Sequence, residues 1–570
     1  MKNLLAITVI YLLGVLHISA GVITLNVQMT SQKEDLPNRI DSLVAIHIDE
    51  NHPGGAVGIL SGTEPLFSKS YGIMDLEQKV NLDENSVFNI ASVSKQFTAF
   101  AILMLESEGK LDLDDNIRRW LPDLPAYDYE ITIRHLLQHT SGIASTDVLR
   151  LFAGLSFDEP WTHQDEYNLI KSYPQLNFTP GESHVYSNGG YSLLAQIVEQ
   201  AGGMNFSAFM EEKVFHPLEM TSTFVLDDPA KPLVNVAKGY TKEGDDFVLV
   251  SSDEDYSYGA GNIYSTMADM IKWGQNLLSA EAKNKRLLNR ISNTYNTLSN
   301  GDTIGYTYGF FVRTHKGIKM VEHSGGVPGF RNQFMIFPDH DLLVILMFNN
   351  EISTRRLATD IVELLLADNL TEEIPKPQIA IDYDPELLRT FEGSYQMPDG
   401  MELTFNFEQD TFWLILPGDH KFQLFAESET RFFLKAFNAQ CTFVISAGGD
   451  VNEMIWHQGG GDHKSLRVED RVELTAGELA EYAGEYAHQE LNASYPIAFA
   501  DGKLTLQPPY TFKKYLGFDS VALNHLNGDR FATDNLGMLE FTRDDSGQLN
   551  GFILASVGRL QNIRFIKLKI

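Results

Sequence analysis

The chain of 570 residues has a single cysteine, Cys441. One cysteine cannot form a disulfide within the chain, and it cannot build a metal site from several thiolates. A protein of this length buries enough apolar surface to fold without covalent cross-links. Because 43% of the residues are hydrophobic and 11% are aromatic, we expect folded domains rather than a disordered chain.

Basic residues are also scarce, with 44 lysines and arginines against 76 aspartates and glutamates, which gives a formal net charge of −32 at pH 7. A surface of this sign repels the phosphates of nucleic acids and the anionic headgroups of membranes. We therefore expect no nucleic-acid partner, and we interpret most of the acidic residues as a solvated surface.

Two motifs of common hydrolases are absent. No G-x-S-x-G occurs in the chain, which disfavours a conventional α/β-hydrolase. His135 and His139 are four residues apart, but they lack the glutamate of H-E-x-x-H and a recognisable third ligand. We expect packing and helix capping to account for these histidines, and we predict no metal and no cofactor.

The N-terminal segment carries no Asp, Glu, Lys or Arg between Leu4 and Val27. Lys2 precedes this apolar run, and Ala20 closes a small-residue cleavage site. The pattern predicts a signal peptide over residues 1–20, and an exported protein without disulfides is typical of a bacterium, where it is secreted or periplasmic. An uncleaved segment that anchors the protein to a membrane is the alternative.

The strongest local signal is the S-x-x-K motif of Ser92 and Lys95, which lies just before an apolar run. On a helix, residues three apart share one face, with Cβ atoms about 5–6 Å apart. A neutral lysine amine can take the proton of a nearby serine hydroxyl and so turn it into a nucleophile. Apolar neighbours such as Val93 and Phe97 favour the neutral amine, because burial disfavours the ammonium form. Ser92 is therefore a candidate nucleophile.

A second S-x-x-K match joins Ser107 and Lys110. Gly109 interrupts it and its surroundings are polar, so this match predicts a helix end rather than a site.

Hydrophobic patterning divides the chain into three folded parts. Strands near both ends of residues 21–370 enclose a helical middle, which predicts an α+β domain with an antiparallel sheet flanked by helices and a helical insert. Three prolines indicate a linker over residues 371–385. Short alternating strands then occur in two similar copies, which predicts two small antiparallel β-barrels over residues 386–472 and 473–570.

Three short motifs follow one another in the predicted α+β domain: Ser92-x-x-Lys95, Tyr186-x-Asn188 and His323-x-Gly325. H-x-G by itself is weak, since it also occurs elsewhere in the chain, but the ordered set is specific. It resembles the serine β-lactamase and penicillin-binding protein superfamily, on the branch closest to class C β-lactamases. Similar flanking sequences extend the resemblance over roughly residues 35–365. The two predicted barrels resemble the three-domain architecture of the D-aminopeptidases in this superfamily.

The resemblance implies hydrolysis through an acyl-enzyme. Ser92 would attack a carbonyl carbon, and Lys95 and Tyr186 would move its proton. Asn188 would orient Lys95 and the substrate amide. The backbone N–H groups of Ser92 and Gly326 would form the oxyanion hole.

His323 occupies the first position of the H-x-G motif, where penicillin-binding enzymes commonly carry a lysine. A histidine is mostly neutral at pH 7, so we expect weaker recognition of a substrate carboxylate. The resemblance then favours a serine hydrolase acting on small amides or short peptides, including those with D-amino acids. Two alternatives stay open: a carboxylesterase on the same scaffold, and a receptor that binds penicillin or cell-wall fragments with little turnover.

The two predicted barrels carry no catalytic set of their own. We expect them to cover the cleft, to restrict the size of the substrate, or to hold a homo-oligomer together. Glycines in residues 456–463 allow close backbone approach, so this segment is a candidate for a loop that reaches the active site, although the tip of a hairpin is the simpler interpretation.

Overall fold

The structure is a computed structural model, and it describes residues 35–228, 233–250, 258–294, 296–371, 380–397, 401–416, 420–437, 439–446, 448–458, 461–468, 474–533 and 535–569. The predicted signal peptide and most of the predicted linker lie outside these residues. Among the helices described, none is long and apolar enough to cross a membrane.

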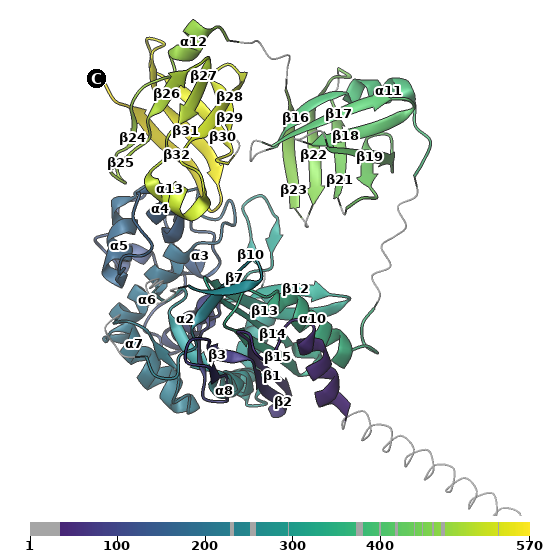
Figure 1. Ribbon diagram of the computed structural model, residues 1–570. Coiled ribbons are helices and arrows are strands. Elements are labelled where there is room, and N and C mark those ends of the chain that lie inside the picture. The colour runs from purple at the N-terminus through teal and green to yellow at the C-terminus, as the bar shows by residue number, and fades with distance from the viewer. Residues whose placement is uncertain are drawn as a thin grey trace, which may run out of the picture.

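The first domain, residues 35–371, is built on a six-stranded antiparallel sheet of order β12-β13-β14-β15-β1-β2 (Figure 1). Its strands are β1 (Gly55–Ser61), β2 (Glu64–Tyr71), β12 (Phe311–His315), β13 (Ile318–Val327), β14 (Phe330–Phe337) and β15 (Leu342–Phe348). Because β1 pairs with β15, the first and last thirds of the domain form one sheet, and the helical insert lies between them in sequence. The predicted fold class is confirmed.

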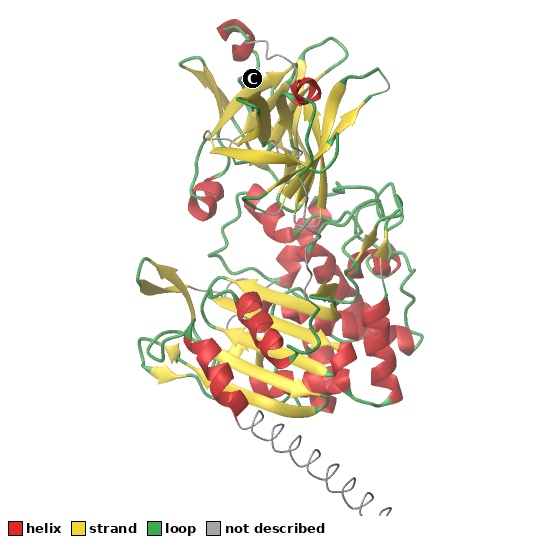
Figure 2. Ribbon diagram, turned by 90° about the vertical axis from the view of Figure 1, so that its right-hand side faces the viewer, coloured by secondary structure: helices red, strands yellow, loops and turns green. Residues whose placement is uncertain are grey.

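The sheet is covered by helices on both faces (Figure 2), and β15 shows why. All seven of its residues are buried and apolar, and alternate side chains point to opposite faces of a strand. Val344 packs with the helix over residues 35–45 and with α10 (Thr354–Leu365). Ile345 packs in the main core, to which α8 (Met267–Leu278) also belongs.

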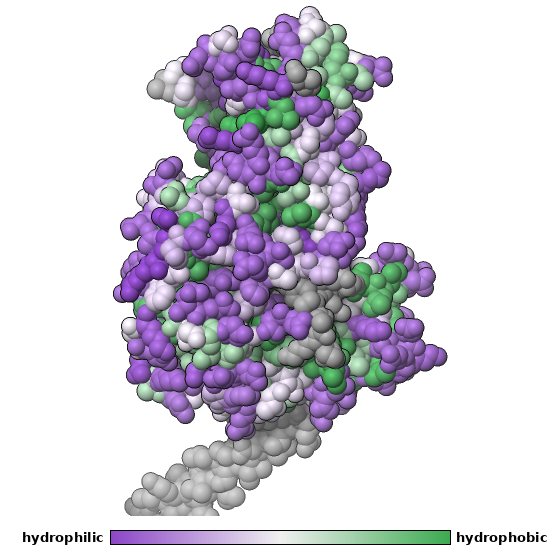
Figure 3. Space-filling view, turned by 90° about the vertical axis from the view of Figure 1, so that its left-hand side faces the viewer, coloured by the Kyte–Doolittle hydropathy of each residue, from purple (hydrophilic) through white to green (hydrophobic). Residues whose placement is uncertain are grey.

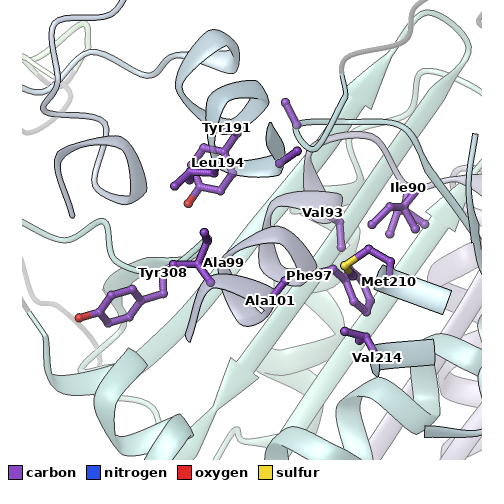
Figure 4. Close-up of a cluster of buried hydrophobic side chains, with 14 of the residues drawn as sticks. Ile90, Val93, Phe97, Ala99, Ala101, Tyr191, Leu194, Met210, Val214 and Tyr308 are labelled. Atoms are coloured by element: carbon purple, nitrogen blue, oxygen red, sulfur yellow. The ribbon is translucent and has the colours of Figure 1, made fainter. Parts of the chain in front are cut away.

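The helical insert forms the main core with the S-x-x-K helix at its centre. Its helices, besides α8, are α2 (Lys95–Ser107), α3 (Ile133–Leu137), α4 (Thr146–Phe152), α5 (His163–Ser172), α6 (Asn188–Gly202), α7 (Phe206–Phe209) and α9 (Ala282–Asn293). Phe97 and Ala101 on α2 pack in one cluster with Tyr191 on α6 (Figure 4). The second S-x-x-K match lies at the end of α2, as predicted, and Gly109 there adopts φ +69°.

The first barrel follows α11 (Pro385–Phe391) and is closed. Its strands are β16 (Gly393–Gln396), β17 (Glu402–Glu408), β18 (Thr411–Leu416), β19 (His420–Ala426), β20 (Arg431–Leu434), β21 (Ala439–Ile445), β22 (Val451–Gln458) and β23 (Gly461–Arg467). Aromatic side chains fill it, with the Phe391 and Phe443 rings stacked 4.4 Å apart. The buried thiol of Cys441 lies in this core.

The second barrel is a nine-stranded antiparallel sheet of order β25-β24-β32-β31-β30-β29-β28-β27-β26. Its elements are α12 (Ala476–Ala480), β24 (Tyr486–His488), β25 (Ala493–Ser494), β26 (Ile497–Ala500), β27 (Lys503–Leu506), α13 (Tyr510–Leu516), β28 (Val521–Asn527), β29 (Arg530–Thr533), β30 (Met538–Arg543), β31 (Leu549–Val557) and β32 (Leu560–Lys567). The two ends of the sheet approach each other through a bridge between Gly484 and Ile497.

The second barrel shares a hydrophobic core with the first domain. Leu149 and Phe152 of α4 are buried in the same cluster as Tyr495 and Phe512 of the barrel. Two hydrogen bonds fix the contact, because the Tyr495 hydroxyl donates to the Phe152 carbonyl at 2.6 Å and the Thr511 hydroxyl donates to the Leu151 carbonyl at 2.8 Å. The second barrel and the first domain therefore form one packed unit.

The surface reflects the excess of acidic residues. The face in Figure 3 is mostly hydrophilic. The two most exposed large apolar side chains among the described residues, Ile46 at 74% and Val234 at 72%, lie far apart in the sequence. Scattered exposure of this kind is usual for a folded domain.

We predict that Phe152→Ala destabilises the packed unit by about 3–5 kcal/mol, because it leaves a cavity in the shared core. Leu155→Ala is the matched control, since Leu155 is 39% exposed and should change the stability by no more than about 0.5 kcal/mol. Urea unfolding followed by tryptophan fluorescence measures both. Equal, small effects of the two substitutions would contradict a shared core.

Candidate active site

The S-x-x-K motif brings its serine and lysine into contact. The sequence predicted both residues on one helix, but Ser92 lies on a 3₁₀ turn, η1 (Ala91–Ser94), and Lys95 begins α2. The difference does not separate them, because residues i and i+3 of a 3₁₀ turn are eclipsed. Lys95 Nζ lies 3.1 Å from Ser92 Oγ. Lys95 is fully buried, whereas Ser92 is partly exposed.

The amine of Lys95 is held by acceptors from two further segments. Lys95 Nζ donates to Asn188 Oδ1 at 2.9 Å and to the Ala260 carbonyl at 2.8 Å. It also lies 4.8 Å from the ring centroid of Tyr186 and 5.6 Å from that of Tyr191. The sequence motifs of Lys95 and Asn188 therefore meet at one nitrogen atom.

The backbone around Ser92 is shaped by two close contacts. Ala91 adopts φ +48°, a conformation that ordinary residues rarely take, and Asn89 Oδ1 accepts its N–H at 2.8 Å. A Cβ at Gly325 would lie 2.3 Å from the Ile90 carbonyl oxygen, so only glycine lets β13 lie against η1. Gly326, in contrast, is exposed, and a Cβ there would meet nothing closer than 3.7 Å.

Tyr186 lies beside the serine, just before α6. Burial raises the pKa of its phenol above the ordinary value, and a hydrogen bond with the Ser92 side chain offsets only part of that rise. Tyr186 is therefore a protonated phenol at neutral pH. Its hydroxyl also lies 3.5 Å from His323 Nε2, which links the Y-x-N and H-x-G motifs.

His323 is a neutral imidazole at pH 7, as predicted. Its Nδ1 donates to the Ser324 carbonyl at 2.7 Å, which leaves Nε2 as an acceptor, and the Tyr306 hydroxyl donates to Nε2 at 3.2 Å. Burial and the nearby charge of Lys95 lower the pKa of His323 to about 3. The residue cannot supply a positive charge to a substrate under ordinary conditions.

Sequence reasoning missed Tyr306, and no motif surrounds it that could have identified it. Its side chain is fully buried, and burial raises the pKa of its phenol far above the ordinary value. Its ring centroid is 4.5 Å from that of His139. By donating to His323 Nε2, Tyr306 thus favours the tautomer of His323 in which Nε2 is the acceptor.

The histidine pair His135 and His139 has structural roles, and the interpretation as capping and packing is confirmed. His135 Nδ1 accepts from the Thr132 N–H at 3.3 Å and completes a capping box at the start of α3. The His139 ring packs 4.2 Å from the Tyr186 ring, and its Nδ1 accepts from the Ser187 N–H at 3.1 Å. Within the described part of the chain, no group of three or more His, Cys, Asp or Glu side chains could hold a metal ion.

The turn that reaches the site comes from the second barrel. Arg559, between β31 and β32, places its guanidinium carbon 4.7 Å from the centroid of the Tyr186 ring. In the segment 456–463, the other candidate for this role, residues 456–458 pair with residues 461–463 as the antiparallel strands β22 and β23, which agrees with the hairpin interpretation. Its residues 459–460 lie outside the described residues.

Acid should destabilise the protein through the histidines around Tyr186. Burial lowers the pKa of His184 to about 4, below the value of about 6.5 expected in the unfolded chain. Between pH 6.5 and 4 the unfolded chain binds a proton at this position that the folded protein does not. The free energy of unfolding should therefore fall as the pH falls, by up to about 1.4 kcal/mol per pH unit for each such group.

The matched variants are His184→Gln and His216→Gln, since the His216 side chain is 60% exposed. Urea unfolding at several pH values between 6.5 and 4 should show a shallower pH dependence for His184→Gln and an unchanged one for His216→Gln. The same slope in both variants would contradict a neutral, partly buried His184.

Comparisons with known proteins assign the chain to a family. The family described as Beta-lactamase matches residues 37–369, more than half of the chain. Penicillin-binding protein 4* of Bacillus subtilis (strain 168) is 30% identical over 444 residues, which cover 74% of this chain and 96% of that protein. D-aminopeptidase of Brucella ovis is 26% identical over 317 residues, 56% of this chain and 60% of that protein.

Two solved structures share the fold. The octameric penicillin-binding protein homologue from Pyrococcus abyssi has a TM-score of 0.51 at 22% identity and covers 76% of this chain and 99% of its own. The D-amino acid amidase from Ochrobactrum anthropi SV3 has a TM-score of 0.50 at 22% identity, with coverages of 59% and 99%. At these identities the two structures show the fold alone. The family match covers more than half of the chain, and the Bacillus relative is 30% identical over most of both chains. These two findings show that this chain belongs to the Beta-lactamase family of serine hydrolases.

Proposed function

We propose that the protein is an exported serine hydrolase that cleaves small amides or short peptides, including those with D-amino acids, through an acyl-enzyme on Ser92. The observation that carries the proposal is the contact of 3.1 Å between the partly exposed Ser92 Oγ and the buried Lys95 Nζ. A serine hydroxyl needs an adjacent base to become a nucleophile, and this amine is within reach of its proton.

The hydrogen bonds of Lys95 support its role as that base. Asn188 Oδ1 and the Ala260 carbonyl can only accept, so each takes one N–H of the amine. A neutral amine has two N–H bonds and one lone pair, so the lone pair of Lys95 Nζ then points toward Ser92. The Ser92 proton moves to Lys95 Nζ as Ser92 Oγ forms a bond to the substrate carbonyl carbon.

Tyr186 is suited to act as the general acid for the leaving group. Its phenol is protonated at neutral pH because burial raises its pKa, and the Ser92 side chain is close enough to offset part of that rise. When the C–N bond of the substrate breaks, the Tyr186 proton passes to the leaving nitrogen, and the proton held by Lys95 restores the phenol. A water molecule then attacks the carbonyl carbon of the acyl-enzyme. The bond from that carbon to Ser92 Oγ breaks, which frees Ser92 and releases a carboxylic acid.

The N–H groups of Ser92 and Gly326 are proposed to bind the developing oxyanion. Gly326 is exposed at the end of β13, and Gly325 lets this strand approach the Ser92 turn. Removing one such donor from an oxyanion hole typically costs about 2.7–4 kcal/mol of transition-state stabilisation.

The preference for an amide over an ester is supported by the D-aminopeptidase relatives rather than by a contact in the site. A carboxylesterase would use the same residues in the same roles. Parallel assays with a p-nitroanilide, a p-nitrophenyl ester and nitrocefin on the purified protein separate the two activities and test for β-lactam turnover.

Ser92→Ala should abolish covalent labelling by a fluorophosphonate, because this reagent reacts with an activated serine hydroxyl. Ser107→Ala is the matched control, since Ser107 belongs to the second S-x-x-K match at the end of α2 and should not affect labelling. Intact-mass spectrometry measures both. Labelling that survives in Ser92→Ala would refute the proposed function.

Lys95→Ala and Tyr186→Phe should each lower kcat by about 10²- to 10⁴-fold, the usual contribution of a general acid or base. Tyr167→Phe serves as the control, because the Tyr167 hydroxyl bonds to Asp123 on the exterior of the domain. Steady-state kinetics on the best substrate of the panel measures the effects, with circular dichroism to verify folding. A folded Tyr186→Phe with wild-type kcat would exclude Tyr186 as the acid.

A further inference from the structure

Arg559 brings a positive charge from the second barrel to the proposed general acid. Its guanidinium carbon is 4.7 Å from the centroid of the Tyr186 ring, and Lys95 Nζ is 4.8 Å from the same centroid. Contacts of this length between a cation and an aromatic face are attractive. Arg559, which follows Tyr186 by about 370 positions in the sequence, thus contacts the same aromatic ring as the amine of Lys95.

The turn that carries Arg559 is fastened to the first domain by a single asparagine. Asn177 Nδ2 donates to the Arg559 carbonyl at 3.0 Å, and Asn177 Oδ1 accepts from the Gln561 N–H at 3.0 Å. Asn562 Nδ2 donates to the Asn177 carbonyl at 3.2 Å. Gly558 adopts φ +58° at the tip. Backbone and side-chain bonds on both sides of Arg559 therefore fix its position.

The side chain of Arg559 is also connected to the site. Its Nη1 donates to Asp147 Oδ2 at 3.3 Å. The other carboxylate oxygen of Asp147 accepts from the Ser145 hydroxyl, and Ser145 Oγ accepts from the Asn188 N–H at 3.0 Å. The chain of hydrogen bonds runs from Arg559 to the first residue of α6, which in turn holds Lys95.

Arg559 retains capacity for an anion. Its side chain is 42% exposed and that of Asp147 is 38% exposed, so solvent reaches the pair. A guanidinium has five N–H donors, and among the described residues its only side-chain hydrogen bond is the one from Nη1 to Asp147. Two basic groups of the site itself are less suited, because His323 is neutral and Lys95 is fully buried.

We propose that Arg559 binds a carboxylate on the leaving group of the substrate. The inference rests on the proposed function, in which Tyr186 protonates the leaving group, so that a charge beside Tyr186 faces the leaving-group side of the cleft. A planar guanidinium suits a carboxylate, with which it forms two parallel hydrogen bonds. The substrates are then short peptides, or esters of similar shape, that carry a free carboxylate on the departing part.

This assignment changes the expectation drawn from His323. A neutral imidazole at the H-x-G position supplies no charge for a carboxylate, and in this proposal the second barrel supplies that charge from another direction. The barrel thereby becomes part of the substrate site, and its docking on α4 and α5 determines where the charge lies.

The test compares two acetate esters that differ by one group, those of 3-hydroxybenzoate and 3-hydroxybenzamide. The leaving group carries a carboxylate in the first and a neutral amide in the second. We expect Arg559→Ala to lower kcat/KM for the benzoate ester about 10- to 100-fold more than kcat/KM for the benzamide ester, the size expected for a charge-assisted hydrogen bond. Arg559→Lys should retain part of the preference.

Two other arginines are matched controls. Arg564 lies on β32 of the same hairpin, and Arg313 pairs with Glu322 near His323. Arg564→Ala and Arg313→Ala should leave the ratio of the two kcat/KM values unchanged. Because both esters are measured on one sample, a loss of folded protein cancels in the ratio.

Fluorophosphonate labelling of Ser92 in each variant separates this inference from the proposed function. If Ser92 is not labelled in the wild type, the proposed function fails. If Ser92 is labelled but Arg559→Ala lowers both esters equally, or Arg313→Ala changes the ratio instead, the carboxylate site is overturned while the hydrolase remains. Wild-type protein that is labelled but accepts neither ester also counts against the site.

Discussion

The site depends on the burial of one amine. Lys95 is fully enclosed, and a buried polar group without partners costs several kcal/mol. Its acceptors come from three separate segments, the Ser92 turn, the start of α6 and the Ala260 loop. The amine can be buried only where all three meet, so the same contacts that stabilise this part of the core also aim the amine at the serine.

Neutral polar groups surround that amine. His139, Tyr306 and His323 are buried and Tyr186 is partly buried. All four are uncharged at neutral pH, with pKa values that burial shifts away from the physiological range. In such surroundings hydrogen bonds are stronger than in water. A positive charge from the second barrel lies beside Tyr186, because Arg559 contacts the Tyr186 ring and is still reached by solvent.

Much of the fold could be predicted from local pattern. The uninterrupted apolar run of β15 indicates a strand buried on both faces, and the alternating strands after the linker indicate barrels. Ser92 and Lys95 were predictable because their spacing places them together in any helical turn, whether α or 3₁₀. Asn188 and Gly325 were found through the motifs of a known superfamily, and the contacts with Lys95 and the Ile90 carbonyl explain why these residue types are needed.

The sequence by itself determined the α+β and barrel architecture and the serine–lysine pair, because short-range spacing and hydrophobic periodicity decide these features. Tertiary structure alone decided that Tyr306 directs His323 and that Arg559 reaches Tyr186. Neither residue has a motif, and the second comes from a barrel whose position depends on a shared core of α4, α5 and the barrel. Tyr306 is 17 residues before His323 and Arg559 is hundreds of residues after Tyr186. Both distances exceed the spacing that helix or strand periodicity can report, so these contacts arise only when the packed surfaces meet.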